Sequence, residues 1–413
     1  MKLNISQKSW VLYDMGNAAY ALIVRTVFAA LLFKYCADDV WGRENTTAYW
    51  GYVCSIAGIA AGAVSIIFGF FADRFRLKKH CLALFVFIGT AATAGFALMQ
   101  KGMAWSVLIL SFLSLGCYMS ANSFYDSLLL SVAPKSLRDR LSSLAYACGY
   151  MGGVIPFLIC LGLSMAVKNK ILVMQLSFII AALWWLLLTF PMLKIVRERK
   201  TFSGENGQQP SLNFAANFKE LLKNKNVLLF LTAYFLYIDG VGTIYTMAAP
   251  IASDIGITTP QLLAVILGLQ FLAFPCTLLY GTLSKRFHPR NLVLLAIGIY
   301  VLISILALLL GLPCCREYRL HIFIILAILI GTSQGGIQSL SRSLFSRIVP
   351  SRKAAEFFGF YNLFGKFTTI VGPVLIGFAT ALWGKAEFGI TLLAIPFILG
   401  AVLLTKVDFR PVR

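Results

Sequence analysis

The chain has 413 residues, of which 59% are hydrophobic and 13% charged, and its formal net charge is +20. With a mean hydropathy of +0.82, this composition excludes a soluble globular domain. The sequence also lacks the alternating pattern of outer-membrane barrels. Apolar stretches of ~20 residues, long enough to cross a ~30 Å hydrocarbon core as helices, follow one another along the chain. We therefore predict an all-α membrane protein.

Taken in chain order, a hydropathy window of about 19 residues predicts twelve transmembrane helices. The first follows Lys2 and Lys8 but has no small-residue cleavage site, so we expect a retained helix and not a signal peptide. Twelve spans place both termini on the same side. The predicted spans cover residues 9–33, 50–72, 81–100, 104–131, 141–166, 171–192, 226–252, 260–283, 291–312, 320–346, 356–382 and 388–405.

The distribution of basic residues predicts the orientation. If the termini are cytoplasmic, that side carries 25 of the 36 Lys and Arg residues, and the opposite connections carry 8. Cytoplasmic connections are enriched in Lys and Arg, so this orientation is favoured. The same distribution explains the net charge without a nucleic-acid partner. We expect contact with anionic membrane lipids instead.

The chain also divides into two similar halves. The polar connection 194–225 is linker-like, so we predict two six-helix bundles, 1–193 and 226–413. The stretch Gly69–Phe75 after span 2 resembles Gly281–Phe287 after span 8. Further matches lie at a constant offset of 216 residues, which indicates the internal duplication common in alternating-access transporters. They pair Ser123, Ser127, Leu128, Pro134 and Gly149 with Ser339, Ser343, Leu344, Pro350 and Gly365.

Several motifs resemble a known family. The pattern of Gly69, Asp73, Arg74 and the basic residues after them resembles the loop 2–3 signature of the major facilitator superfamily. Longer blocks resemble its vacuole-effluxer-like family, whose fungal members are autophagy-related vacuolar amino-acid exporters: Ser9–Tyr20, Tyr237–Val241, Gln334–Ser343 and Glu356–Lys366. The resemblance implies the major facilitator fold, with spans 1, 4, 7 and 10 lining a central cavity. It also implies a bacterial-type member in the inner membrane.

Six charged residues fall inside predicted spans, where charge is costly and usually functional. At ~1.5 Å per residue, they divide by depth into two tiers. Asp14, Asp126 and Arg342 lie near the cytoplasmic boundary. Deeper in the membrane lie Asp239, Lys366 and Arg25. Arg25 departs from the family, which usually has an apolar residue there.

Four residues are candidates for a cytoplasmic gate. By the resemblance, Asp73 and Arg74 would hold the two halves together on that side; the alternative for the basic run is topology determination alone. Asp126 and Arg342 occupy matching repeat positions, so a pseudo-twofold axis would oppose their charges across the cytoplasmic mouth. The alternative is that each bonds within its own half or snorkels to the interface.

The remaining candidates could bind solute or a coupling proton. A desolvated Asp239 carboxylate suits proton carriage, while Lys366 and Arg25 suit an anionic group. The alternative is a structural Asp239–Lys366 ion pair, with the polar residues acting as interhelical hydrogen-bonding contacts. The other candidate residues are Asp14, Asn17, Gln334, Gln338 and Asn362.

These features predict a secondary active transporter. We expect a monomer that moves a small polar, zwitterionic or anionic solute, amino-acid-like by the resemblance, with protons as coupling ion and no cofactor or metal. The alternative is a lipid or lysolipid translocator, and a non-transporting receptor on the same fold stays open. The sequence contains no GxxxxGK[ST], GxSxG or HExxH motif, so we do not expect an enzyme.

Overall fold

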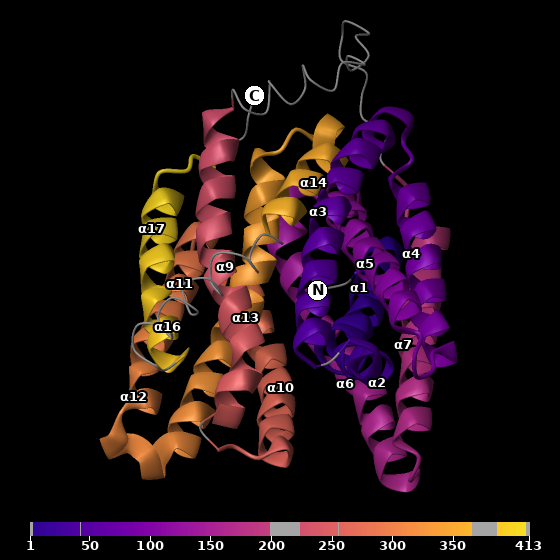
Figure 1. Cartoon of the computed structure of the whole chain (residues 1–413). Coiled ribbons are helices and arrows are strands. Elements are labelled where there is room, and N and C mark those ends of the chain that lie inside the picture. The colour runs from indigo at the N-terminus through magenta and orange to yellow at the C-terminus, as the bar shows by residue number, and fades with distance from the viewer. Residues whose placement is uncertain (1–2, 42, 199–223, 255, 366–385, 410–413) are drawn as a thin grey trace, which may run out of the picture. The chain divides into compact units, whose positions relative to one another are not determined.

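The computed structural model describes residues 3–41, 43–198, 224–254, 256–365 and 386–409. Every regular element in these ranges is a helix (Figure 1). The longer helices are α1 (Ile5–Ala19), α2 (Ala29–Trp41), α3 (Arg43–Phe75), α4 (Lys78–Gly95), α5 (Ala104–Val132), α6 (Arg138–Ala166), α7 (Lys170–Ile195), α9 (Lys225–Asp254), α10 (Thr259–Leu283), α11 (Pro289–Leu306), α13 (Arg319–Ile348), α14 (Ala354–Phe364) and α17 (Ala394–Thr405). The shorter ones are η1 (Tyr20–Phe28), η2 (Phe96–Leu98), η3 (Lys135–Leu137), α12 (Leu308–Gly311), η4 (Pro313–Tyr318), η5 (Ser351–Lys353) and α16 (Ala386–Leu392).

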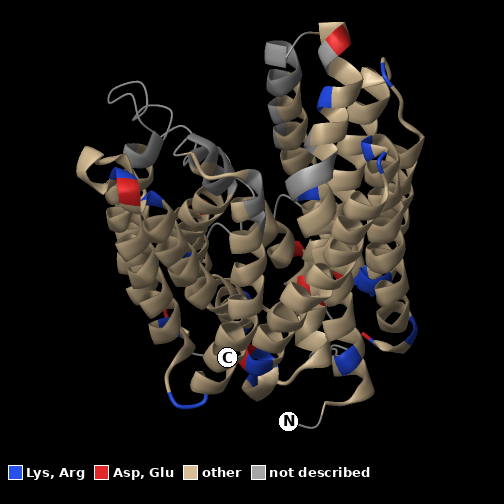
Figure 2. Cartoon of the chain, turned by 90° about the horizontal axis from the view of Figure 1, so that it is seen from below, with Lys and Arg blue, Asp and Glu red and all other residues tan. Residues whose placement is uncertain are grey.

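Nine helical segments within the described residues are long and apolar enough to cross a membrane. Most of the helical ribbon carries no charged residue (Figure 2). Large apolar side chains such as Leu187, Ile109 and Leu295 are exposed on it. This surface suits a hydrocarbon solvent, and the all-α fold class agrees with the sequence analysis. The predicted span 9–33 is not among these nine, and the predicted span 388–405 is represented by the shorter apolar helix Gly389–Thr405. Much of the predicted span 356–382 lies outside the described residues, so the count of twelve stays a prediction.

The first predicted span is a continuous helix with an unusual middle. Helix α1 passes into the π-helical segment η1, which passes into α2. At its end the Ala29 amide bonds to the Val24 carbonyl, five residues back, instead of four. The segment carries Arg25, the intramembrane cation predicted from the sequence. Nothing in the composition of residues 20–28 indicated this geometry.

Several helix starts are fixed by capping side chains. Asn4 accepts from the Gln7 amide at 2.8 Å, and the Gln7 side chain accepts from the Asn4 amide at 3.1 Å, forming a capping box. Asn169 accepts from two amides at the start of α7. Helix α11 begins with Pro289 after the cap residue His288. These caps satisfy amides that have no partner within the helix.

The described helices form two compact units. Unit 1 comprises residues 1–134, 148–210 and 350–363, and unit 2 comprises 135–147, 211–349 and 364–413. In unit 1, α5 packs on α3 and α4, and α1 packs on α7. In unit 2, α13 packs on α10 and α11, and α9 packs on α17 (Figure 1). Each unit therefore has its own core of packed apolar helices.

The two units exchange short segments of sequence. The start of α6, residues 135–147, belongs to unit 2, whereas residues 350–363 of the second half belong to unit 1. Shifting 135–147 by the repeat offset of 216 gives 351–363. The two exchanged segments are therefore equivalent parts of the two repeats, and each belongs to the unit formed mainly by the other half of the sequence. The predicted domain boundaries at 193 and 226 stay a prediction.

Candidate functional site

A polar stripe runs along α5 in unit 1. Tyr118, Asn122 and Asp126 follow each other at four-residue intervals, so their side chains lie on one face of the helix. Between residues 117 and 130 every residue is buried except Asn122, which is half-buried. Asn122 is therefore the one partly exposed residue in this part of α5. It lies near the middle of the 29-residue helix.

Asn122 joins a short hydrogen-bond network with α1. The Asn17 amide nitrogen donates to the Asn122 side-chain oxygen at 2.8 Å. Tyr118, one turn away on α5, also bonds to Asn122 through its side chain. Asn17 is 6% exposed. The partly exposed Asn122 amide is therefore held in place by hydrogen bonds from α1 and from its own helix.

Aromatic rings surround this network. Trp10 and Tyr13 of α1 each stack on Tyr125 with ring centroids 4.5 Å apart. Tyr20 stacks on Tyr118 at 4.4 Å. The Tyr20 hydroxyl accepts from the Ser114 hydroxyl at 2.9 Å. Such packing fixes the positions of α1 and α5 relative to each other, because stacked rings allow little sliding.

Two predicted charged residues lie beside this cluster. Arg25 in η1 is exposed and interacts electrostatically with Tyr20 and Tyr118. Asp14 in α1 is half-buried and interacts electrostatically with Tyr13 and Tyr118. Both signs of charge therefore act on the same aromatic group. Such an environment suits a ligand that carries charge or a strong dipole.

Unit 2 repeats the stripe on α13. Gln334, Gln338 and Arg342 lie at four-residue intervals and at the repeat positions of Tyr118, Asn122 and Asp126. Between residues 333 and 346 every residue is buried except Gln338, which is half-buried. The two duplicated helices, α5 and α13, are therefore partly exposed at the same repeat position, and each has an amide side chain there.

The deep acidic residue Asp239 lies in α9 of unit 2. It is 1% exposed. Its neighbour Tyr237 shares a 2.6 Å hydrogen bond with Ser341 of α13, so α9 is fixed to the stripe-bearing helix. The predicted partner Lys366 lies outside the described residues, and the Asp239–Lys366 pair stays a prediction.

Arg342 is held inside unit 2 by the exchanged start of α6. Its Nε donates to the Ser142 hydroxyl at 2.9 Å, and one terminal nitrogen donates to the Ser142 carbonyl at 3.1 Å. The guanidinium lies 4.4 Å from the centroid of the Tyr146 ring. Arg342 is 1% exposed, so these contacts stabilise a charge that water does not reach.

Further charged contacts join the same two helices. Arg138 donates to the Ser346 carbonyl at 2.7 Å. Asp139 accepts from Ser343 and forms an ion pair with Arg347. The start of α6 is thus attached to α13 by several charge-assisted hydrogen bonds, each worth roughly 1.5–3 kcal/mol.

Unit 1 contains the matching arrangement. The Asn362 amide nitrogen donates to the Asp126 carboxylate at 3.0 Å. Asn362 is the repeat position of Tyr146, as Asp126 is of Arg342. The predicted direct pair of Asp126 and Arg342 stays a prediction, but each residue is observed to contact the exchanged segment of its own unit.

Asp73 fixes the beginning of the other exchanged segment. Its carboxylate forms an ion pair with Lys78 at 2.7 Å and accepts from the Glu356 amide at 2.9 Å. Arg74 lies 5.7 Å from the centroid of the Phe75 ring, and the Lys79 side chain donates to the Val196 carbonyl. The loop signature therefore makes specific contacts in addition to any effect on topology.

Small residues permit both close approaches. A Cβ on Gly69 would lie 2.8 Å from the Ala355 carbonyl oxygen, and one on Gly281 would lie 2.7 Å from the Ser143 Cβ. The two glycines belong to the duplicated loop motif, and Ser143 is the repeat position of Gly359. The motif glycines are thus explained by backbone proximity to the exchanged segments.

The structure adds residues that the sequence analysis did not select. In unit 1 these are Tyr118 and Asn122, and in unit 2 Asp139, Ser142 and Tyr146. The repeat offset contained a signal for the first two, because Gln334 and Gln338 are their counterparts. Within the described residues no group of three His, Cys, Asp or Glu side chains could hold a metal.

The fold and its duplicated polar stripes define a class of protein: a multi-pass transporter fold. The structure of the proton:xylose symporter XylE, a member of the major facilitator superfamily, superimposes with a TM-score of 0.76 at 15% identity, covering 97% of this chain and 95% of that one. A likeness at this identity concerns the fold alone.

The chain belongs to the vacuole effluxer Atg22-like family, whose profile it matches over residues 39–135 and 131–411. The MFS-type transporter YxiO of Bacillus subtilis is 37% identical over 415 residues, covering 97% of this chain and 94% of that protein. Autophagy-related protein 22-2 of Aspergillus clavatus is 28% identical over 285 residues, covering 63% of this chain and 46% of the fungal protein. These relatives agree with the prediction of a transporter and not an enzyme.

Proposed function

We propose that the protein is a proton-coupled secondary transporter that moves a small zwitterionic or anionic solute by alternating access. The proposal rests on two half-buried amide side chains. Asn122 and Gln338 are the only residues within 117–130 and 333–346, respectively, that are not fully buried. An amide in the middle of an apolar helix is costly to leave facing lipid. Facing a solute path, it would provide both a donor and an acceptor.

The charged residues suggest the solute class. Arg25 would bind a carboxylate or phosphate, and Asp14 would accept from an ammonium group. A solute with both groups, such as an amino acid, would satisfy both. Asp239 is proposed to carry the coupling proton, since it is a buried carboxyl group on α9, the helix that is hydrogen-bonded to the stripe-bearing α13. Lys366 is kept as a candidate anion partner.

The exchanged segments suggest the gate. We expect residues 135–147 and 350–363 to leave their units when the predicted cytoplasmic side opens. Arg342, Asp126 and Asp73 would then lose their contacts with these segments. Arg74, whose described contact is with the neighbouring Phe75 ring, is kept as a candidate gate residue. The predicted topology, with both termini cytoplasmic in the inner membrane, places all four near this side.

The experiment is solute uptake into proteoliposomes at controlled internal and external pH. A thermal-shift screen of amino acids, organic acids, nucleosides and lysolipids first selects ligands, because a ligand raises the melting temperature through binding linkage. Asn122→Ala and Gln338→Ala should each reduce uptake at least ~10-fold, the effect of losing about 1.4 kcal/mol of recognition. Gln100→Ala, in an exposed turn, is the matched control and should transport normally.

Three results would contradict the proposal in whole or in part. Normal uptake by both amide variants would move the binding site elsewhere. Translocation of lysolipids without uptake of any soluble solute would favour the lipid translocator instead. Uptake unaffected by a pH gradient would remove proton coupling and leave the solute site intact.

A further inference from the structure

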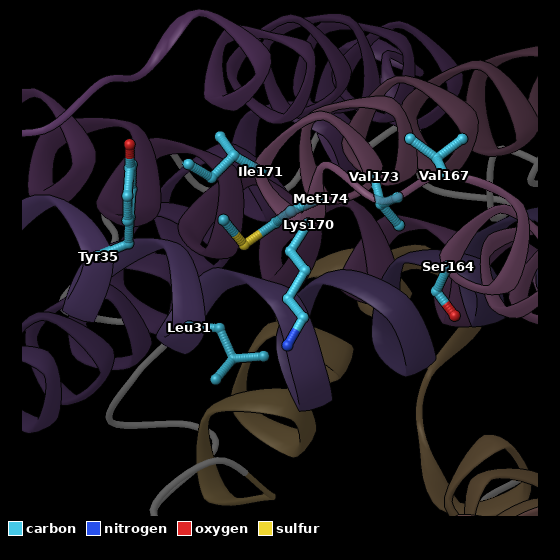
Figure 3. Close-up of a pocket in the computed structure, with 8 residues that line it drawn as sticks. All are labelled: Leu31, Tyr35, Ser164, Val167, Lys170, Ile171, Val173 and Met174. Atoms are coloured by element: carbon cyan, nitrogen blue, oxygen red, sulfur yellow. The ribbon is translucent and has the colours of Figure 1, made fainter.

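Unit 1 contains a groove of about 480 Å³ between α2 and the connection from α6 to α7 (Figure 3). Leu31 and Tyr35 of α2 form one side. Ser164 of α6 and residues such as Ile171 and Met174 of α7 form the other. Most of the lining is aliphatic, which suits a hydrocarbon chain.

The position of the groove along the helices indicates the membrane surface. Two candidate spans meet there, one ending at Ala166 and the next beginning at Lys170. Ends of membrane-spanning helices lie at the level of the lipid head groups. Leu31 is 52% exposed and Met165 is 84% exposed, so the surface beside the groove is apolar and open to lipid.

A cation lies at this groove. Lys170 is exposed, and in Figure 3 its side chain extends among the lining residues with the ammonium group directed toward Leu31. The first turn of α7 contains no acidic residue. A second cation, Lys101, lies 5.7 Å from the centroid of the Tyr35 ring, although it also pairs with Asp39. Positive charge therefore meets an aliphatic groove at the depth of lipid phosphates.

We propose that this groove binds one anionic glycerophospholipid, with an acyl chain between α2 and α7 and the phosphate paired with Lys170. A basic side chain beside an apolar groove matches the order of groups along such a lipid. The Tyr35 hydroxyl lies in the lining as a further donor. Each buried methylene strengthens binding about fourfold, so a lipid is favoured over a free phosphate. This site is separate from the proposed solute path and does not depend on it.

The test measures lipid binding to the purified full-length protein by native mass spectrometry. The protein is titrated with phosphatidylglycerol or with phosphatidylethanolamine of the same chain length. Phosphatidylglycerol should bind at least ~5-fold more tightly. Lys170→Gln should weaken phosphatidylglycerol binding about fivefold, the effect of one basic residue. Lys168→Gln is the matched control, because Lys168 is exposed in the same connection but does not line the groove.

A second variant tests the acyl-chain part of the site. Leu31→Ser changes an exposed residue, so folding should be preserved, and it should weaken binding of both lipids alike. Equal losses in Lys168→Gln and Lys170→Gln would reduce the site to general surface charge and overturn the proposal. Equal affinity for the two lipids would also overturn it. Displacement of the lipid by millimolar glycerol 1-phosphate would instead identify a free-anion site.

Discussion

His288 caps α11 through its own imidazole, which makes this helix start sensitive to protonation. Its Nδ1 accepts from the Arg290 amide at 3.2 Å, and a protonated ring nitrogen cannot accept. Partial burial lowers the pKa of His288 below its ordinary value of 6.5, and the positive charges of Arg347 and Arg290 lower it further, whereas Asp139 opposes them. The folded state therefore favours the neutral ring.

We predict a loss of thermal stability as pH falls through about 6.5. The unfolded chain binds more protons in this range because the folded pKa is the lower one, so folding becomes less favourable at acid pH. His288→Asn keeps an uncharged cap and should flatten the melting temperature between pH 7 and pH 5.5. His321→Asn lies in α13, whose start has no side-chain cap, and should retain the parent's pH dependence. Parallel curves for the parent and His288→Asn would contradict the prediction.

At the scale of the helices, close packing in unit 1 depends on particular glycines. A Cβ on Gly152 of α6 would lie 2.5 Å from the Met15 Cβ and 2.6 Å from its Cα. Backbone atoms cannot move aside as a flexible side chain can. Ten residues further along the same helix, Gly162 has nothing within 4 Å of an added Cβ. The two positions therefore form a matched pair.

We predict that Gly152→Ala destabilises the protein by about 1–3 kcal/mol through overpacking between α1 and α6. Gly162→Ala should be neutral or stabilise by about 0.5–1 kcal/mol, since alanine restricts the unfolded chain more than glycine does. Melting temperatures of the two variants in the same detergent provide the comparison. Equal melting temperatures would mean that α1 and α6 can separate without cost.

The existence of the helices could be predicted because hydropathy is a local property of each span. The exchange of residues 135–147 could not, since a helix start has the same composition whichever unit it joins. Likewise, Arg342 was recognised as an intramembrane cation, but its partners Ser142 and Tyr146 lie about 200 residues away and carry no complementary charge. Asn122 could have been predicted as a site residue, because the repeat offset of 216 relates it to Gln338.

At the scale of the whole molecule, each unit holds a segment of the opposite half of the sequence. Asp73 contributes to this by pairing with Lys78 while accepting from the Glu356 amide. Gly359 of the same exchanged segment packs within 3.1 Å of the Ser65 backbone, as measured from an added Cβ. Ser65 is 1% exposed, so its accessibility reports whether the segment has left unit 1.

We predict that Asp73→Asn releases residues 350–363 more readily, because a neutral amide oxygen accepts more weakly from the Glu356 amide than the carboxylate does. A cysteine in place of Ser65 should then react with a membrane-impermeant maleimide at least ~5-fold faster than in the parent, for a loss of about 1 kcal/mol. Asp39→Asn breaks an exposed pair with Lys101, worth ~0–1 kcal/mol, and should leave the labelling rate unchanged. Identical rates in both variants would show that Asp73 does not hold the segment.

The π-helical segment η1 has a consequence for the ancestry of this chain. A hydrogen bond that spans five residues instead of four accommodates one extra residue in a continuous helix. Segments of this kind therefore behave as single-residue insertions, and a gap is expected near residues 20–28 when this sequence is aligned with relatives whose first helix is α-helical throughout. Removing one residue there would rotate α2 relative to α1 by ~100°.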